Sequence, residues 1–463
     1  MANVIDVAVI GAGLSGLQAA LDIHNAGHSV IILEARDRVG GKTRSVQRLD
    51  GKGMQEIGAA WVNDTNQFHV WDYCQRFGLT PVVQNINGSV ACEDADGTCH
   101  LFPFGEMPRF QKAEIYNIVD IRDFVEATCL NPKTFMEPHR AALDSLTFEQ
   151  WLRDAGAGTR AIQTATLWCR GTSGQDPGEI SALAFLEVAR GGLGIINLRY
   201  DGKDGGQHLR IREGTQSISN GIAKLLPSSC IKLSCPIASV TQTMPQLYSV
   251  TSTIGFTVKT RKVIISIPSP AYKDIQFDPP LPHQRQIYTT STRYGCFVKF
   301  ICLFKAPFWR SQGACGLAQS FRGPVNHCRD TSVDADENYA LTCFLCSEQG
   351  RRWLALNSSD RRDAVLYQLG SLFGVGYDVV RFEFIGSMTS EWPQDRWAGW
   401  GCPFPVTPPG VIGGYGDGQL AMEKCDGLYF VGTEFTDEWR GYMEGALRSG
   451  KRGAAQALQD LRM

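Results

Sequence analysis

Three glycines near the N-terminus have the spacing of a phosphate-binding turn. Gly11, Gly13 and Gly16 form the pattern G-x-G-x-x-G directly after the apolar residues 4–10. Glycines at this spacing permit a tight turn, a close backbone approach to a pyrophosphate, and close packing of the following helix. Glu34 ends a second apolar run, roughly 20 residues further on, where a carboxylate can accept hydrogen bonds from ribose hydroxyls. The combination predicts a dinucleotide site.

Basic residues and a second glycine pair follow Glu34. Gly40 and Gly41 indicate another close backbone approach to the same cofactor, and Arg36, Lys42 and Arg44 are candidates for pairing with its pyrophosphate. The alternative for these three cations is ordinary solvated loop charge.

The elements that must position this turn can be predicted from the pattern of apolar residues. Residues 4–10 are predicted to be a strand, 14–26 a helix and 29–34 a second strand. Strand, helix and strand within about 30 residues make a βαβ unit, which requires a parallel sheet.

The rest of the chain alternates between helical and strand-rich segments. We expect helices over 76–204, strands over 231–268 and a strongly apolar strand over 297–304. Residues 427–431 are predicted to be a strand, followed by a helix from Gly441 onward. The chain is therefore predicted to belong to the α/β class.

Several motifs, in order, resemble those of the flavin monoamine oxidase family, within the FAD-dependent amine oxidases that include polyamine and L-amino-acid oxidases. The resemblance covers nearly the whole chain. The motifs that carry it are residues 34–41, Gly58 to Val62, Gly206-Gln207 before Gly214, Pro307 to Arg310, Val431 to Glu434, and Trp439 to Ala446.

The resemblance implies a Rossmann-like FAD-binding domain with an interleaved α+β substrate-binding domain. Its FAD-binding domain would be discontinuous, over 1–75, 205–285 and 391–463. The substrate-binding domain would comprise 76–204 and 286–390.

The resemblance also implies which residues contact FAD. Lys42 stands where the family prefers arginine, which keeps the charge but loses the bidentate fork. The free amides of Tyr442 and Met443, at the start of the C-terminal helix, are expected to face the pyrimidine end of the flavin. The further cofactor-binding residues implied are Ala59, Ala60, Trp61, Ile237, Trp392, Cys402, Gly432 and Glu434.

Cys402 stands six residues before Pro408-Pro409-Gly410. In membrane monoamine oxidases a cysteine at this spacing is thioether-linked to the flavin, so the resemblance implies covalent FAD at Cys402. Because the chain has 15 cysteines, a buried free thiol is the alternative.

Lys299 interrupts the apolar run 297–304. A lysine there costs desolvation unless it has a partner. In the family this position bonds through water to flavin N5 and is implicated in oxygen reactivity, and the resemblance implies the same catalytic role here. The alternative is a lysine on the solvent face of an edge strand.

Tyr442 resembles one wall of the family's aromatic cage, which positions the amine. The second wall should directly follow the flavin-linked cysteine, but that residue here is Pro403. Phe404 or Trp400 could supply the missing ring. The other pocket residues implied are Tyr200, near the family's gating position, and Gln207.

The predicted function is FAD-dependent oxidation of an amine to an imine, with dioxygen reduced to hydrogen peroxide. Pro403 leaves open an oxidative cyclase that acts on a bulky secondary amine in natural-product biosynthesis, hence in secondary metabolism. An L-amino-acid oxidase would need a carboxylate-binding arginine, and none can be singled out. A non-catalytic flavin-binding protein is the remaining alternative.

Composition narrows the class of protein. The net charge of −2 argues against a nucleic-acid partner, and no apolar stretch reaches the roughly 18 residues that span a bilayer. Cys343 and Cys346 lack a second pair, so no metal is expected and a buried strand is predicted there. With no signal peptide, membrane tail or peroxisomal tripeptide, we expect a cytoplasmic protein. Its expected partners are a small amine and dioxygen. An oligomer is compatible with the sequence.

Overall fold

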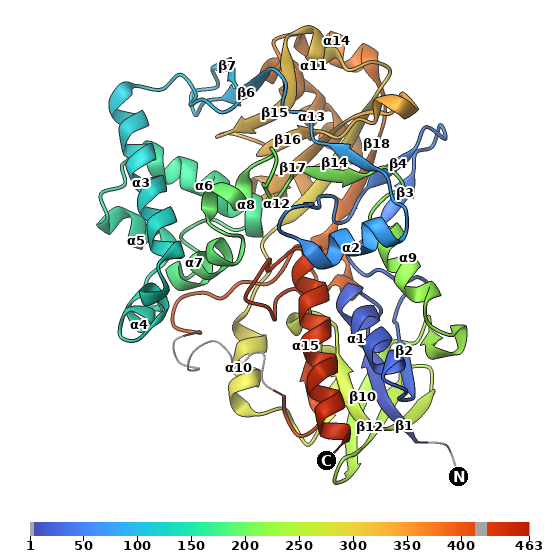
Figure 1. Ribbon diagram of the computed structural model, residues 1–463. Helices are drawn as coiled ribbons and strands as arrows, with labels where there is room; N and C mark the ends of the chain where they lie inside the picture. Colours follow the sequence, from blue (N-terminus) through green and yellow to red (C-terminus); the bar gives the residue numbers. More distant parts are fainter. Residues whose placement is uncertain (1–3, 413–423, 463) are drawn as a thin grey trace.

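A computed structural model describes residues 4–412 and 424–462. One sheet occupies the lower half of the molecule and a second sheet the upper half, with a group of helices beside them (Figure 1). The chain crosses between these parts several times, as the colours of Figure 1 show. The molecule is therefore of the α/β class, as predicted.

The lower sheet has eight strands, in the order β13-β10-β11-β12-β1-β2-β9, with β19 also paired to β12. β1 runs parallel to both β2 and β12, which confirms the predicted βαβ unit. Its strands are β1 (Ile5–Ile10), β2 (Val30–Leu33), β9 (Ile231–Lys232), β10 (Ile237–Met244), β11 (Leu247–Ser252), β12 (Thr257–Ile265), β13 (Gln276–Asp278) and β19 (Leu428–Phe430).

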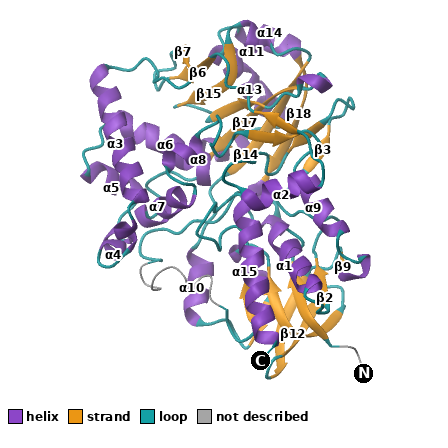
Figure 2. Ribbon diagram, viewed as in Figure 1, coloured by secondary structure: helices purple, strands orange, loops and turns teal. Residues whose placement is uncertain are grey.

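Two helices, α1 (Leu14–Asn25) and α15 (Met443–Leu461), cover one face of this sheet and come from opposite ends of the chain (Figure 2). Glycines let them pack closely. A Cβ atom on Gly450 would lie 2.3 Å from the carbonyl oxygen of Ser15, so any larger residue would push the helices apart.

The upper sheet has seven strands, in the order β18-β14-β17-β16-β15-β6-β7. Strand β14, which lies between β18 and β17, is buried at all eight residues, as the apolar run predicts. Cys343 and Cys346 lie in β17, which confirms the buried strand expected there. The strands are β6 (Ser89–Glu93), β7 (Cys99–Pro103), β14 (Phe297–Phe304), β15 (Ala314–Ser320), β16 (His327–Asp330), β17 (Tyr339–Cys346) and β18 (Phe384–Glu391).

Six helices form a lobe beside the two sheets. The stacked rings of Phe148 and Phe185, 4.0 Å apart at their centroids, lie in the core of this lobe. The helices are α3 (Lys112–Leu130), α4 (His139–Asp144), α5 (Phe148–Asp154), α6 (Thr159–Ser173), α7 (Ala182–Gly191) and α8 (Ile195–Arg199).

The expectation that 76–204 is helical is wrong for its first part. Residues 81–103 contain β5 (Pro81–Val83) and the hairpin of β6 and β7. Asp96-Gly97 at the tip is a turn signal that the helical interpretation overlooked, and Gly97 has a φ of 91°. The hairpin is held by pairing of β6 with β15, more than 200 residues away in sequence, which no local pattern reveals.

The remaining elements connect these three parts. They are β3 (Ser45–Gln47), β4 (Met54–Glu56), β8 (Leu209–Ile211), α2 (Phe68–Arg76), α9 (Gln216–Lys224), α10 (His283–Ser291), α11 (Phe308–Ser311), α12 (Ser347–Leu354), α13 (Ser358–Leu372) and α14 (Gly376–Glu383).

The strands of the two sheets fall within the two expected sets of ranges, except that β18 ends at Glu391. The domain boundaries themselves stay a prediction. Within the described residues, no helix is long and apolar enough to cross a membrane, and no group of His, Cys, Asp and Glu side chains is placed to hold a metal ion.

The cysteines lie mostly in the interior. Eleven of them are buried and four are partly exposed, and all are free thiols. Burial raises the pKa of many of these thiols, and raises it well above its usual value at Cys169, Cys343 and Cys346.

Candidate functional site

The ends of β1 and β2 open onto a cavity of about 940 Å³. Its wall combines residues of the lower sheet, the upper sheet and the helical lobe. One half of the cavity is lined by glycines and short loops, and the other half by aromatic and charged side chains.

The glycine turn follows β1, and its three glycines have three different roles. Gly11 has a φ of 99°, which favours glycine, and a Cβ there would lie 2.8 Å from the carbonyl oxygen of Ser266. A Cβ on Gly16 would lie 2.1 Å from the carbonyl oxygen of Gly11, so this glycine is needed for helix packing. A Cβ on Gly13 would meet nothing within 4 Å, since this glycine faces the cavity, opposite Gly41.

Glu34 follows β2 and its carboxylate is fixed by backbone amides. Oε2 accepts from the amide of Ala12 at 2.6 Å, and Oε1 accepts from the amide of Arg36 at 2.8 Å. Burial raises the pKa of this carboxyl, and the two amides oppose that shift. A carboxylate has about four acceptor positions, so two remain for ligand hydroxyls.

Two of the three predicted basic residues line the cavity. Arg36 lies in its wall and is paired with Asp395 at 2.8 Å. The ammonium of Lys42 donates to Tyr294 Oη at 2.5 Å and to the carbonyl oxygen of Pro403 at 3.1 Å. Burial lowers the pKa of Lys42 to about 8. The side chain of Arg44 is exposed and does not line the cavity, so the structure does not bring Arg44 into the site.

The loop after β19 contributes a second fixed carboxylate. Both oxygens of Glu434 accept from Ser269: Oε1 from its amide at 2.6 Å and Oε2 from its hydroxyl at 2.9 Å. Burial raises the pKa of Glu434 to about 7. Gly432 adopts a φ of 150° beside it, and both residues line the cavity.

The expected free amide at Tyr442 is wrong. The Tyr442 amide donates to the carbonyl oxygen of Trp439 at 3.0 Å, because Trp439 adopts a φ of 54° and closes a tight turn. Helix α15 therefore begins at Met443, and its unpaired amides start there.

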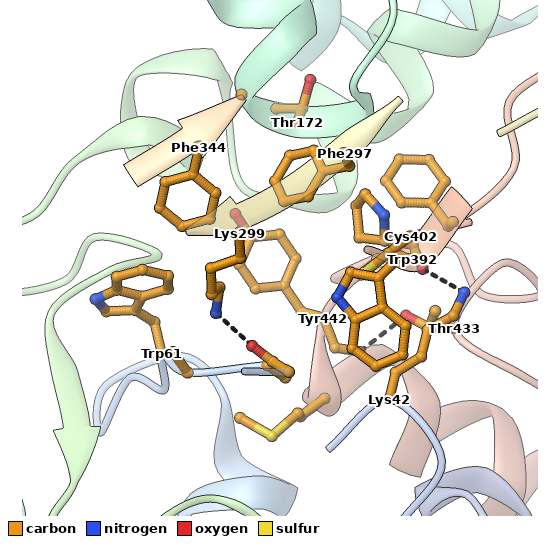
Figure 3. Close-up of a pocket in the computed structure, with 18 of the residues that line it drawn as sticks. Lys42, Trp61, Thr172, Phe297, Lys299, Phe344, Trp392, Cys402, Thr433 and Tyr442 are labelled. Carbon is orange, nitrogen blue, oxygen red and sulfur yellow. Dashed lines mark hydrogen bonds between the residues drawn. The ribbon is translucent and has the colours of Figure 1, made fainter. Parts of the chain in front are cut away.

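Lys299 projects from β14 into the cavity wall (Figure 3). β14 lies between β17 and β18 and Lys299 is 4% exposed, so the alternative of an edge-strand lysine is wrong. Its ammonium donates to the carbonyl oxygens of Glu56 at 2.9 Å and Gly58 at 2.5 Å. Burial lowers the pKa of Lys299 to about 8, and the nearby Glu56 carboxylate opposes that shift.

Cys402 also lines the cavity, close to both lysines (Figure 3). Burial raises the pKa of its thiol, whereas the charges of Lys42 and Lys299 lower it. Cys235 lines the cavity too, but the charges of the two lysines act on the thiol of Cys402.

Tyr442 and Gln207 form a polar pair on the substrate side of the cavity. Nε2 of Gln207 donates to Tyr442 Oη at 3.0 Å and to the carbonyl oxygen of Leu198 at 3.1 Å. Tyr442 Oη donates to the same carbonyl at 3.3 Å. Oε1 of Gln207 is buried and has no hydrogen-bond partner among the described residues, so it is an acceptor available to a ligand.

Two of the predicted aromatic residues, Phe404 and Tyr200, line the cavity, and Trp400 does not. Phe404 is buried in the cavity wall beside Pro403, whereas Trp400 is 42% exposed and outside the wall. Tyr200 lies in the wall with its ring 5.9 Å from that of Phe104. The other predicted residues that line the cavity are Ala59, Ala60, Trp61, Ile237, Trp392 and Met443.

Sequence reasoning missed several charged or titratable residues of the cavity, among them Arg199, Asp201, His327 and Arg329. Asp201 pairs with Arg329, whose Nε donates at 2.5 Å. The ring of His327 stacks on Phe344 at 4.5 Å, and burial lowers its pKa well below the usual value. No motif marks these residues, because they meet only through contact of the helical lobe with the upper sheet.

Comparisons with known proteins agree with this arrangement. The profile of a family described as flavin containing amine oxidoreductase matches residues 14–458. A probable flavin-containing monoamine oxidase A of Dictyostelium discoideum is 28% identical, over 98% of this chain and 97% of its own length. The human flavin-containing amine oxidase B is 29% identical, over 99% of this chain and 87% of its own length.

Solved structures are similar over their full length. A cyclohexylamine oxidase from Brevibacterium oxydans has a TM-score of 0.90 at 25% identity and covers 100% of both chains. A wild-type putrescine oxidase with putrescine bound has a TM-score of 0.90 at 24% identity, over 99% of this chain and 100% of its own, which shows a shared fold.

Proposed function

The chain belongs to the flavin-containing amine oxidoreductases, and from that premise we propose that its cavity holds FAD in the glycine-lined half and the amine in the aromatic half. The enzyme is an oxidoreductase that uses dioxygen to oxidise an amine to an imine, and not a non-catalytic flavin carrier. The observation that carries the proposal is the single cavity that joins the turn of Gly11 and Gly13 to Lys299 and Tyr442.

The residues present fit FAD. Open space at Gly13 suits a pyrophosphate, and the two remaining acceptor positions of Glu34 suit ribose hydroxyls. Lys42, whose hydrogen bonds go to a phenol and a carbonyl, remains a cation without a carboxylate partner among the described residues. The residues proposed to hold FAD are Gly11, Gly13, Glu34, Arg36, Gly41, Lys42, Ala59, Ala60, Trp61, Ile237, Trp392, Cys402, Gly432, Glu434 and Met443.

When bound, FAD supplies the acceptor for the hydride equivalent on the α-carbon of the amine. The chain's own contribution is to orient that amine and keep it neutral. Tyr442 presents an aromatic wall, and Oε1 of Gln207 is free to accept a hydrogen bond from the amine nitrogen. The cations of Lys299 and Arg329 disfavour a protonated amine in the same cavity, because like charges repel at short range.

We propose that Lys299 supports the reaction with dioxygen. Its ammonium is buried and is held by two carbonyl oxygens, so its position is fixed before any substrate arrives. A fixed cation in a site with little water stabilises developing negative charge without reorganisation. Dioxygen would accept two electrons and leave as hydrogen peroxide.

We further propose that Cys402 forms a covalent bond to the flavin. Support comes from its place in the cavity wall. Burial raises the pKa of its thiol, and the charges of the nearby Lys42 and Lys299 offset part of that shift. Acid precipitation of the enzyme should leave the yellow colour with the protein, and Cys402→Ala should release it. Cys74→Ala, at a buried thiol outside the cavity, is the matched control. Flavin that leaves the wild-type protein freely would refute the bond.

The overall function can be tested on the purified enzyme. It should show flavin absorption bands, which primary and secondary amines should bleach in the absence of air. Admission of air should restore the bands, with one hydrogen peroxide formed for each amine consumed. A colourless protein that cannot be reconstituted with FAD, or a yellow one that no amine bleaches, would contradict the proposal.

A further inference from the structure

The guanidinium of Arg199 stands out among the charged groups of the cavity. Arg199 is the last residue of α8, is solvent-accessible and lines the cavity wall. Within the described residues it forms no ion pair and no hydrogen bond, and its guanidinium carbon lies 5.6 Å from the centroid of the Trp168 ring. A cationic side chain thus lines the cavity without an anion bound to it.

The carboxylate of Asp201 acts on Arg199 but is not bound to it. Asp201 binds Arg329 through both oxygens, with Nε at 2.5 Å and Nη2 at 3.4 Å. Two guanidinium groups therefore share one carboxylate, and this part of the wall carries an excess positive charge. His327 also lines the cavity and adds no negative charge, and burial together with the two arginines lowers the pKa of its ring, which keeps it neutral.

Arg199 also lies near the reacting end of the cavity. Its charge contributes to the pKa of Tyr442, and Tyr442 in turn contributes to that of Arg199, so the two side chains are within electrostatic reach. Because protein surrounds the cavity, desolvation lowers the pKa of Arg199 to about 10, which leaves it a cation at neutral pH.

We infer that the substrate is an aromatic amine that carries a carboxylate, and that Arg199 binds this carboxylate. The inference rests on the proposed function. An unpaired guanidinium is a strong bidentate partner for a carboxylate. The rings of Trp61, Phe104, Phe297 and Phe344 supply an apolar surface for the remainder of the substrate. Oε1 of Gln207 can accept a hydrogen bond from the amine nitrogen of the substrate.

Binding can be tested apart from turnover. Calorimetric titration of the FAD-loaded enzyme with 3-phenylpropionate and with its uncharged amide should show tighter binding of the acid, by roughly 10- to 100-fold. Arg199→Gln should abolish this difference, and Arg199→Lys should retain part of it. Equal affinity of wild type for acid and amide would overturn the inference.

Kinetics with matched amines test the same inference during catalysis. The first probe is 2-phenylethylamine, which has no carboxylate. L-Phenylalanine carries a carboxylate beside the amine, and 4-(2-aminoethyl)benzoate carries one at the far end of the ring. At least one carboxylated amine should exceed 2-phenylethylamine in kcat/KM by tenfold or more. Arg199→Gln should remove that advantage, because it should lower kcat/KM for the carboxylated amine by far more than for 2-phenylethylamine. If Arg199→Gln slowed all three equally, Arg199 would be only structural.

Arg190→Gln is the control for a structural role. Arg190 makes a similar contact with an aromatic ring, 4.7 Å from Phe135, in the same helical lobe but outside the cavity. The two proposals fail differently. If acids bind through Arg199 but no amine reduces the flavin, the proposed function falls; if amines are oxidised with no preference for a carboxylate, this inference falls.

Discussion

The two halves of the cavity are lined by different kinds of residue. The glycine-lined half is mostly backbone and small residues, and its carboxylates Glu34 and Glu434 are fixed by hydrogen bonds from the main chain and Ser269. The other half is made of long side chains, such as Arg199 and Arg329, from segments far apart in the sequence. The first half is suited to a ligand whose shape never changes, and the second can differ from one substrate to another.

The largest effects are expected at two glycines of the glycine-lined half, where one substitution should lower stability and the other should weaken FAD binding. Gly16→Ala should destabilise the protein itself by about 1–3 kcal/mol, because its Cβ would clash with the carbonyl oxygen of Gly11. Gly13→Ala should leave the free energy of unfolding of the FAD-free protein within about 1 kcal/mol of wild type and weaken FAD binding by roughly 100-fold. Thermal unfolding of the FAD-free protein and FAD titration measure the two quantities. If Gly13→Ala bound FAD normally, the cofactor would not approach that glycine.

The next effect concerns Lys299, at the junction of the two halves. Lys299→Met should retain FAD and be reduced by amines at close to the normal rate. Its reaction with dioxygen should slow by roughly 100-fold, comparable to the loss of one preorganised donor. Stopped-flow mixing of substrate-reduced enzyme with aerated buffer measures that rate. An unchanged rate would leave Lys299 with a purely structural role, as a donor to the carbonyl oxygens of Glu56 and Gly58.

The rates of the two steps, amine oxidation and the reaction with dioxygen, should change in opposite directions as the pH rises. The pKa of Lys299 is lowered to about 8, so its cation is present below that pH and lost above it. The dioxygen step should therefore slow above pH 8, by up to tenfold per unit. Amine oxidation should instead speed up with pH as the substrate loses its proton. In Lys299→Met the decline of the dioxygen step above pH 8 should vanish, and its persistence would assign that decline to another group.

The smallest effect is expected at Arg44. Its side chain is exposed and outside the cavity, so Arg44→Ala should change FAD affinity by less than about twofold. Arg36→Ala, which removes the partner of Asp395 in the cavity wall, should weaken FAD binding more. Equal losses in the two variants would mean that Arg44 moves into the site when FAD binds.

Sequence reasoning succeeded where the signal is local. The glycine turn, Glu34 and the buried strand with Lys299 each lie within one short segment whose chemistry is set by its own residues. It did not find the pair of Asp201 and Arg329, which are 128 positions apart and belong to different parts of the fold. It also missed Arg199, because an arginine that ends a short helix looks like an ordinary surface residue until the cavity is seen.

The interior thiols have a consequence for an enzyme that would generate hydrogen peroxide beside them. Peroxide attacks thiolates, and a thiol whose pKa is raised by burial stays protonated and reacts slowly. Cys169, Cys343 and Cys346 meet this condition, in the helical lobe and in the upper sheet. Burial would in this way protect the interior thiols, eleven of the 15 cysteines, from such a product without any disulfide.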